Sequence, residues 1–260
     1  MNDIIIEIKN LSRRVGNHFL IKNINWNVKR GEHWIVFGEN GSGKTTLLSA
    51  IAGYGSYDNG SCLVFGEDVA SCDLTTLRKR IGWISSSYFD KQYRNETVLE
   101  IILSGKSGTL GLRHGITNYD LLKAQYLLQL CHLSHKRDCL FCTLSKGEQQ
   151  NILICRALIA NPEILIMDEP CTGLDIMARE RVFQWLRQYA QQEDITLIYV
   201  THYMEEILDI FQKCLFLKNG IIYQQGFTDE LLTDEVMSDY FERPIQIKQE
   251  NNRRIAIFKE

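Results

Sequence analysis

The sequence lacks a strong charge of one sign, a long hydrophobic run and an export signal. The formal net charge is −3 and the basic clusters are short and dispersed, so no nucleic acid is expected as a partner. No stretch approaches the ~20 apolar residues that a membrane-spanning helix needs. The opening MNDIIIEIKN has acidic side chains on both sides of its isoleucines, unlike a secretory signal. We therefore expect a cytoplasmic chain that reaches a membrane only through a partner.

Internal repeats and low-complexity tracts are also missing, and the composition is that of an ordinary globular protein. Apolar residues make up 45% and charged residues 23%, which excludes disordered, collagen-like and disulfide-scaffold proteins. The eight cysteines, without an export signal, indicate reduced cytosolic thiols. A length of 260 residues predicts one large domain, or one domain with a sizeable subdomain.

Five potential metal ligands lie close together in the middle of the chain: Cys131, His132, His135, Cys139 and Cys142. These residue types suit zinc, but structural zinc sites usually pair two short motifs across a longer spacer, and this cluster is one contiguous stretch. Cys131 also continues the apolar pattern of a helix (Leu121, Leu122, Tyr126, Leu127, Leu130), where a thiol acts as a small hydrophobic group. We favour packed or surface thiols and histidines over a metal site, and a metal assay on the purified protein would decide between them.

Hydrophobic patterns predict an α/β fold. Ile4, Ile6 and Ile8 alternate on one face, as do Ile24, Trp26 and Val28, which indicates antiparallel strands with one covered face. Continuous apolar runs at 34–37, 164–167, 197–200 and 215–217 are typical of strands buried on both faces. The last three follow helical patterns, which predicts strand, helix and parallel strand as the repeated unit.

The pattern changes between about 88 and 160, where helical periodicity dominates and a glycine-rich segment at 104–115 predicts a loop. After Gly220 we expect a short strand at 221–224, a helix around 229–241 and a hairpin that turns near Asn251-Asn252. The predicted organisation is a domain over 1–225 with a helical subdomain inserted at about 88–160, followed by a helix and hairpin extension over 226–260.

Residues 38–45 fit the phosphate-binding loop pattern G-x-x-x-x-G-K-[ST]. Glycines let backbone N–H groups turn onto phosphate oxygens, and the helix that follows points its positive end at the same anion. Lys44 can reach the β- and γ-phosphates, and the Thr45 hydroxyl is placed to ligate Mg²⁺. The predicted nucleotide-binding residues here are Gly38, Glu39, Asn40, Gly41, Ser42, Gly43, Lys44, Thr45 and Thr46.

Two further segments carry residues suited to nucleotide chemistry. The apolar run 164–167 ends in Asp168, which suits a metal-associated role, and Glu169, which could deprotonate an attacking water. Ser145 precedes a helical pattern and Glu148 follows three residues later, which predicts a capping box. A serine and a glycine at a helix N-terminus could equally form a second phosphate-binding surface.

Taken together in chain order, the motifs of residues 4–225 resemble those of the nucleotide-binding subunits of ATP-binding cassette (ABC) proteins. The resemblance is to single-cassette importers of molybdate or metal-chelate type. The motifs are the phosphate loop, LSKGEQ at 144–149, ILIMDEP at 164–170, GLD at 173–175 and Thr201-His202. The resemblance implies a P-loop NTPase with a RecA-like core, an antiparallel β subdomain and a helical subdomain. It also implies ATP and Mg²⁺ as ligands, Asp168 beside Thr45 at the metal, and Glu169 as catalytic base.

The resemblance further implies a head-to-tail dimer of two copies. ATP would lie between the phosphate loop of one copy and Ser145, Gly147 and Glu148 of the other, with Asp175 across the interface. His202 would act as the switch histidine at the γ-phosphate, and residues 95–100 resemble the region that contacts integral membrane permease subunits.

Two positions depart from the family pattern. Val15 stands where an adenine-stacking aromatic is expected; His18 or Phe19 could substitute, or the adenine could lie on an apolar surface. Ser86 stands where a glutamine senses Mg²⁺ and couples to the membrane partner. We expect an ATPase subunit of a transporter on the cytoplasmic face of the membrane. A soluble cassette ATPase in repair, translation or regulation is the alternative that Ser86 supports. A nucleotide-binding protein without turnover is disfavoured by Glu169 and His202.

Overall fold

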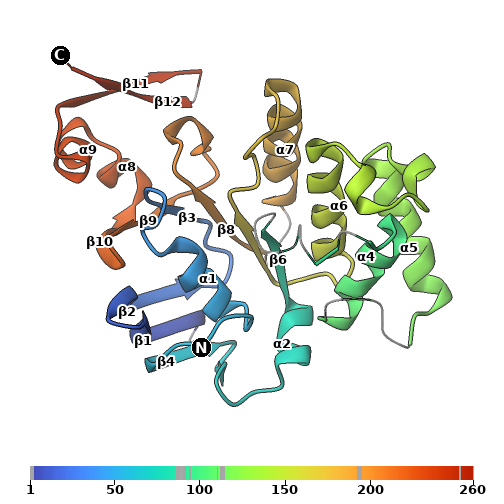
Figure 1. The fold of residues 1–260 in the computed structure, drawn as a ribbon. Coiled ribbons are helices and arrows are strands. Elements are labelled where there is room, and N and C mark those ends of the chain that lie inside the picture. Colours follow the sequence, from blue (N-terminus) through green and yellow to red (C-terminus); the bar gives the residue numbers. More distant parts are fainter. Residues whose placement is uncertain are drawn as a thin grey trace. The chain divides into compact units, whose positions relative to one another are not determined.

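A computed structural model describes residues 3–85, 89, 92–93, 95–109, 111, 115–191, 195–251 and 253–259 (Figure 1). The chain divides into two compact units, Met1–Ser71 with Tyr189–Glu260 and Cys72–Gln188, and each is described by itself. Ser86, at the glutamine position, lies outside the described residues, as does Asn252 of the expected hairpin turn. No described helix has both the length and the apolar character needed to cross a membrane.

The first unit begins with a four-stranded antiparallel sheet in the order β2-β1-β4-β5. Its strands are β1 (Ile4–Val15), β2 (His18–Lys29), β4 (Asn59–Val64) and β5 (Glu67–Asp68). In β2, Ile24, Trp26 and Val28 are buried while the asparagines between them are exposed. The alternating pattern thus correctly predicted an antiparallel pair with one covered face.

The first unit also contains the strand that leads to the phosphate loop. This strand, β3 (Trp34–Phe37), pairs in parallel with β8 (Thr196–Thr201) and with β9 (Lys213–Lys218). Every residue of β3 and β8 is buried, which confirms the prediction from the continuous apolar runs. Helix α1 (Lys44–Ile51) follows the loop, and β10 (Ile221–Phe227) pairs antiparallel with β9 and extends past the expected strand end.

The segment after β10 differs from the single helix expected around 229–241. Two short helices, α8 (Thr228–Leu231) and α9 (Asp234–Phe241), lie there. The break has a local cause, because the Thr233 side chain accepts a hydrogen bond from the Val236 N–H and so begins a new helix. Strands β11 (Ile245–Glu250) and β12 (Arg253–Phe258) then pair antiparallel.

The second unit combines a pair of buried parallel strands with helices. The strands are β6 (Ile81–Ser85), which the sequence reading missed, and β7 (Ile164–Asp168). The helices are α2 (Leu74–Arg80), α4 (Val98–Ser104), α5 (Asn118–Leu130), α6 (Lys146–Leu158) and α7 (Ile176–Tyr189, whose last residue falls in the first unit). The residues described between β6 and β7 contain helices and an isolated bridge between Thr97 and Leu140, but no strand.

The glycine-rich segment at 104–115 is not a loop at its start. Ser104 is the last residue of α4, and Gly105–Ser107 form a 3₁₀ turn. Gly105 is required by packing, because a Cβ atom there would lie 2.0 Å from the carbonyl oxygen of Arg156 in α6. Positions 110 and 112–114 of the segment lie outside the described residues.

Arg156 is buried and links α6 to α4. Its guanidinium carbon lies 4.6 Å from the centre of the Phe89 ring and 5.4 Å from that of Tyr93. Its Nε donates to Ser104 Oγ at 3.2 Å, and its Nη2 donates to the Thr109 carbonyl oxygen at 3.3 Å. Stacking and hydrogen bonds together compensate the desolvation of this charge.

The apolar pattern of α5 does not mark its buried face. Leu122, Tyr126 and Leu130 are each more than half exposed, whereas Ala124, Leu127 and Leu128 are buried. Cys131, expected to continue the apolar pattern, is instead the half-buried residue that ends the helix. The sequence pattern did not identify the buried face because apolar residues lie around more of the circumference of α5 than the part that packs against the rest of the unit.

Candidate functional site

The phosphate loop lies between β3 and α1, at the carboxyl end of β3. Gly41 and Gly43 have φ angles of 83° and 103°, in the left-handed region that favours glycine. Gly43 also begins α1, since its carbonyl oxygen accepts from the Leu47 N–H at 3.0 Å. A Cβ atom on Gly43 would lie 2.6 Å from the carbonyl oxygen of Leu20, so this glycine is needed for conformation and for space.

Side chains of the loop are arranged to receive an anion. Lys44 is 5% exposed, and its Nζ donates to the carbonyl oxygens of Gly38 at 2.7 Å and Glu39 at 2.9 Å. The Ser42 hydroxyl is buried and has no hydrogen-bond partner, which costs about 1–3 kcal/mol. A phosphate oxygen is an acceptor that would satisfy it. Thr45 is an exposed residue in the first turn of α1, and its hydroxyl oxygen is a ligand type that Mg²⁺ accepts.

The end of β8 lies beside the start of this loop in the same unit. The Gly38 N–H donates to the Thr201 carbonyl oxygen at 3.4 Å, and the half-buried His202 follows directly. Glu206, 3% exposed, accepts from the hydroxyls of Thr201 at 2.6 Å and Tyr199 at 3.0 Å. These bonds fix the end of β8 beside His202. The sequence reading missed Glu206, whose only local sign is an acid among the apolar residues that follow β8.

In the second unit, Asp168 and Glu169 lie at the carboxyl end of β7. Asp168 is 4% exposed, and its Oδ2 accepts from the Ser85 hydroxyl at 3.2 Å. The sequence reading missed Ser85 as a site residue. Ser85 ends β6, Asp168 ends β7, and the two residues pair in register. Glu169 has a φ angle of 51°, a left-handed conformation that costs about 1–3 kcal/mol in a residue other than glycine.

The predicted capping box at the start of α6 is confirmed. Ser145 Oγ accepts from the Glu148 N–H at 3.3 Å, and Glu148 Oε2 accepts from the Ser145 N–H at 2.8 Å and lies 2.9 Å from Ser145 Oγ. The bond from the Ser145 N–H is the main cause that lowers the pKa of Glu148. Glu148 therefore carries its negative charge at the helix N-terminus, where the helix dipole favours it.

Gly147 lies inside the first turn of α6 without a packing requirement of its own. A Cβ atom there would meet its nearest neighbours, in Leu174 and Ala178, at 3.9 Å, which is an ordinary contact. Asp175, by contrast, has a clear local role, because its Oδ1 accepts from the Ala178 N–H at 2.8 Å and caps α7. The contacts within this unit thus explain why an aspartate stands at position 175, but they give no reason for a glycine at position 147.

The cluster between Cys131 and Cys142 does not gather around one point. No group of three or more histidine, cysteine or acidic side chains that could hold a metal ion occurs in the described part of the chain. His132, His135 and Cys142 are exposed. Cys131 is the exception, because its sulfur lies 3.6 Å from that of Cys155 in α6.

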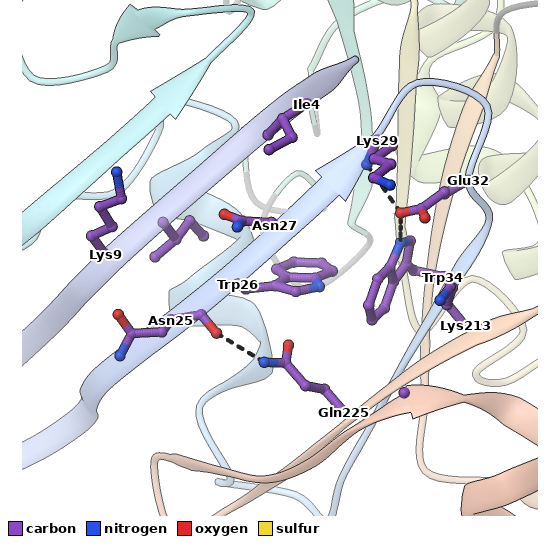
Figure 2. Close-up of a pocket in the computed structure, with 12 residues that line it drawn as sticks. Ile4, Lys9, Asn25, Trp26, Asn27, Lys29, Glu32, Trp34, Lys213 and Gln225 are labelled. Carbon is purple, nitrogen blue, oxygen red and sulfur yellow. Dashed lines mark hydrogen bonds between the residues drawn. The ribbon is translucent and has the colours of Figure 1, made fainter. Parts of the chain in front are cut away.

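A separate cavity of about 560 Å³ lies in the first unit (Figure 2). Trp26 and Trp34 form its aromatic wall, with ring centres 5.3 Å apart, and the indole N–H of Trp34 donates to Glu32 at 3.0 Å. Trp34 and Lys213 are the first residues of β3 and β9. This cavity therefore lies at the amino ends of parallel strands, whereas ligands of such folds bind at the carboxyl ends, where the phosphate loop begins.

The β1–β2 hairpin, in which the sequence places the adenine contact, carries exposed apolar side chains. Val15 is 56% exposed, Phe19 44% and Leu20 39%, and His18 is also exposed. The Leu20 backbone is the one that packs against Gly43 of the phosphate loop. The hairpin thus carries both an exposed apolar surface and the Leu20 backbone that packs against the phosphate loop.

Comparisons with known proteins agree with these features. Residues 21–172 match the protein family described as ABC transporter. The uncharacterised ABC transporter ATP-binding protein YlmA of Bacillus subtilis is 37% identical over 251 residues, which cover 96% of this chain and 95% of that protein. A solved metal-chelate type ABC transporter in an inward-facing conformation is 26% identical, with a TM-score of 0.76 over 98% of this chain and 97% of that chain.

A bacterial ABC transporter cassette solved as a dimer is also 26% identical, with a TM-score of 0.75 over 85% of this chain and 98% of that chain. These similarities identify the fold as the α/β P-loop NTPase fold of ABC cassettes. The chain belongs to the ABC transporter family and is an ATP-binding, ATP-hydrolysing transporter subunit.

Proposed function

We propose that two copies of this chain associate head to tail, enclose two Mg²⁺-ATP molecules, and use their hydrolysis to move separate membrane subunits. The observation that carries this proposal is the phosphate loop, with its buried Lys44 and its unpaired Ser42 hydroxyl. Residues 38–46 would bind the phosphates through backbone N–H groups and the Lys44 ammonium. The exposed end of the β1–β2 hairpin, Val15 to Leu20, would support the adenine.

The residues present suit a magnesium ion, which prefers oxygen ligands and would neutralise charge on the phosphates. Thr45 and Asp168 would hold it, and Ser85 would orient the Asp168 carboxylate through the 3.2 Å hydrogen bond. Glu169 would accept the proton of the attacking water, and His202 would donate a hydrogen bond to the γ-phosphate. The left-handed backbone at Glu169 supports a functional constraint at that position.

A second copy would complete the site with Ser145, Gly147 and Glu148. Ser145 is exposed at the N-terminus of α6, where N–H groups and the helix dipole favour an anion. Gly147 has no packing reason to lack a side chain, which supports the close approach of another molecule. The dimeric cassette among the related structures supports the same association.

The membrane partners would be integral permease subunits, contacted through residues 95–100 at the start of α4, and the chain would lie on the cytoplasmic face. Related proteins described as transporter subunits, and the solved transporter of metal-chelate type, favour this role over a soluble ATPase in repair or translation. Co-isolation with a membrane protein from gently solubilised native membranes is the expected result. A chain found wholly free of membranes, with hydrolysis stimulated by nucleic acid, would support the alternative.

Glu169→Gln tests the catalytic assignment. The variant keeps the shape of the side chain but cannot accept a proton, so it should bind ATP, stall turnover and accumulate an ATP-bound dimer in size-exclusion chromatography. Lys44→Ala should weaken ATP binding itself, and Ser145→Arg should block dimer closure without affecting ATP binding to the monomer. Normal hydrolysis by Glu169→Gln would show that another group is the base.

A further inference from the structure

Two thiols in the second unit lie close enough to react with each other. Cys131 ends α5 and Cys155 lies in α6, and their sulfur atoms are 3.6 Å apart. Cys155 is 1% exposed, and its thiol also lies 3.7 Å from the Leu127 carbonyl oxygen. Cys131 is half-buried, so it is the member of the pair that solvent can reach.

Both cysteines line a cavity of about 790 Å³ whose lining residues all belong to the second unit and include residues of α5, α6 and α7. Apolar walls come from side chains such as Leu127, Ile154 and Trp185, and Ser145 and Glu148 line the same cavity. A cavity of this size admits water and small solutes. A small reagent that enters this cavity therefore lies beside Cys131.

The local hydrogen bond gives the two thiols different roles. The hydrogen bond between the two thiols outweighs burial and lowers the pKa of Cys131. The same interaction and burial raise the pKa of Cys155 well above its usual value. The lower pKa and the greater exposure make Cys131 the thiol of the pair that forms a thiolate more readily. This is the arrangement of an attacking cysteine beside a resolving cysteine.

We propose that Cys131 and Cys155 are an oxidation site at which a hydroperoxide such as hydrogen peroxide forms an intrachain disulfide. The Cys131 thiolate attacks one peroxide oxygen and the O–O bond breaks. This step gives a Cys131 sulfenic acid and a hydroxide ion that takes a proton and leaves as water. The Cys155 sulfur then attacks the Cys131 sulfur, the S–O bond breaks, and the departing hydroxide takes the Cys155 proton. The two sulfurs lose two electrons in total, and the peroxide is reduced to two waters.

The disulfide would join the end of α5 to the helix that Ser145 begins. The two sulfurs lie 3.6 Å apart and a disulfide requires about 2.05 Å, so they must approach by about 1.5 Å for the bond to form. Cys142, an exposed thiol in the same unit, offers a comparison because it is more open to solvent than the half-buried Cys131.

Mass spectrometry of the full-length protein tests the proposal. Reduced protein is titrated with hydrogen peroxide, remaining thiols are blocked, and peptides are mapped without reduction. We expect a peptide cross-linked through Cys131 and Cys155 at a peroxide dose that leaves most of Cys142 as thiol, and we expect dithiothreitol to reverse it. Oxidation of Cys142 while Cys131 and Cys155 remain thiols would overturn the proposal.

Variants assign the two roles. Cys155→Ser should leave Cys131 as a sulfenic acid that dimedone traps, and Cys131→Ser should leave Cys155 reduced. Cys142→Ser is the matched control and should form the cross-link as the unaltered chain does. Circular dichroism checks that each variant is folded. The peptide mapping of the unaltered chain tests the disulfide itself and does not depend on whether the variants fold. A dimedone adduct on Cys155 in place of Cys131 would contradict the assignment.

Discussion

Replacement of Ser145 by alanine separates two roles that this residue has in the structure and in the proposed dimer. In the chain itself, the Ser145 hydroxyl accepts the Glu148 N–H at 3.3 Å and lies 2.9 Å from the Glu148 carboxylate. In the proposed dimer, the same hydroxyl would contact the ATP bound to the other copy. The first role affects the free energy of unfolding, and the second affects turnover.

The structure sets the size of the first effect. Ser145 is exposed, so water can replace the lost bond to the Glu148 N–H. The bond from the Ser145 N–H to the Glu148 carboxylate, at 2.8 Å, does not involve the hydroxyl and remains. We therefore expect Ser145→Ala to cost about 1 kcal/mol in unfolding free energy, a typical value for a cap, and to lower the melting temperature by about 2–4 °C.

Thr117→Ala is the matched control, because Thr117 begins α5 with the same capping box. Its hydroxyl accepts the Asp120 N–H at 3.3 Å and lies 2.7 Å from the Asp120 carboxylate. Asp120 is only 1% exposed and also pairs with Lys106 at 3.0 Å, so water compensates less well there. We expect a loss of about 1–2 kcal/mol in Thr117→Ala, at the upper end for a cap.

Urea denaturation and steady-state ATPase assays on both variants complete the test. A hydrogen bond to a charged group contributes about 1.5–3 kcal/mol, so loss of the Ser145 contact should lower turnover by about tenfold or more. Thr117→Ala should keep near-normal turnover at a temperature where it is fully folded. Equal loss of turnover in both variants would mean that helix capping alone explains the defect. Normal turnover in Ser145→Ala would mean that its hydroxyl only caps α6.

Gly43→Ala should destabilise the chain more than Gly41→Ala. A Cβ atom at position 43 would lie 2.6 Å from a backbone carbonyl oxygen. A Cβ atom at position 41 would have no atom within 4 Å, so Gly41→Ala adds only backbone strain of about 1–2 kcal/mol. Equal losses of unfolding free energy in urea denaturation would contradict the close packing at Gly43. The pKa of Glu148 is lowered in the folded chain from an ordinary value of 4.5, so its carboxylate stabilises fully above pH 4.5 and this stabilisation is lost as pH falls through the lowered pKa. The stability difference between the unaltered chain and Glu148→Gln should therefore shrink in acid, and a difference independent of pH would refute the capping role. Arg156→Lys keeps the charge but loses the planar stacking group, so we expect the free energy of unfolding to fall by about 2 kcal/mol in thermal denaturation. An unchanged melting temperature would refute the stacking role.

Local signals predicted the strands and the helix start that carry the site. The buried runs at 34–37 and 164–167 are continuously apolar, and the box at Ser145 and Glu148 lies within one turn, so each can be recognised without knowledge of the rest of the chain. The strand Ile81–Ser85 was missed because Gly82 interrupts its apolar run and Ser85 ends it, although every residue of the strand is buried.

Other features depend on contacts that no local pattern contains. The hydroxyl of Ser85 is a site feature only because β6 lies in register with β7 and faces Asp168. Glu206 and Arg156 are charged residues with buried side chains, and their partners lie on other elements, in β8 for Glu206 and in α4 for Arg156. The left-handed backbone of Glu169 likewise has no signal in the residue type. Tertiary pairing, which periodicity does not encode, determines each of these.

Residues that cap helices are ambiguous evidence for a binding site, because the chain already needs them. Asp175 caps α7, and Ser145 with Glu148 caps α6, so their presence would be explained in a protein that bound nothing. Ser42 and Gly147 are different, because the described contacts give the buried hydroxyl no acceptor and give the glycine no packing requirement. A buried donor without an acceptor has a cost in the isolated chain that a bound phosphate would remove, and a missing side chain leaves room for a close contact. Of the motif residues, these two therefore support an external ligand most directly, and their replacement should affect binding more than folding.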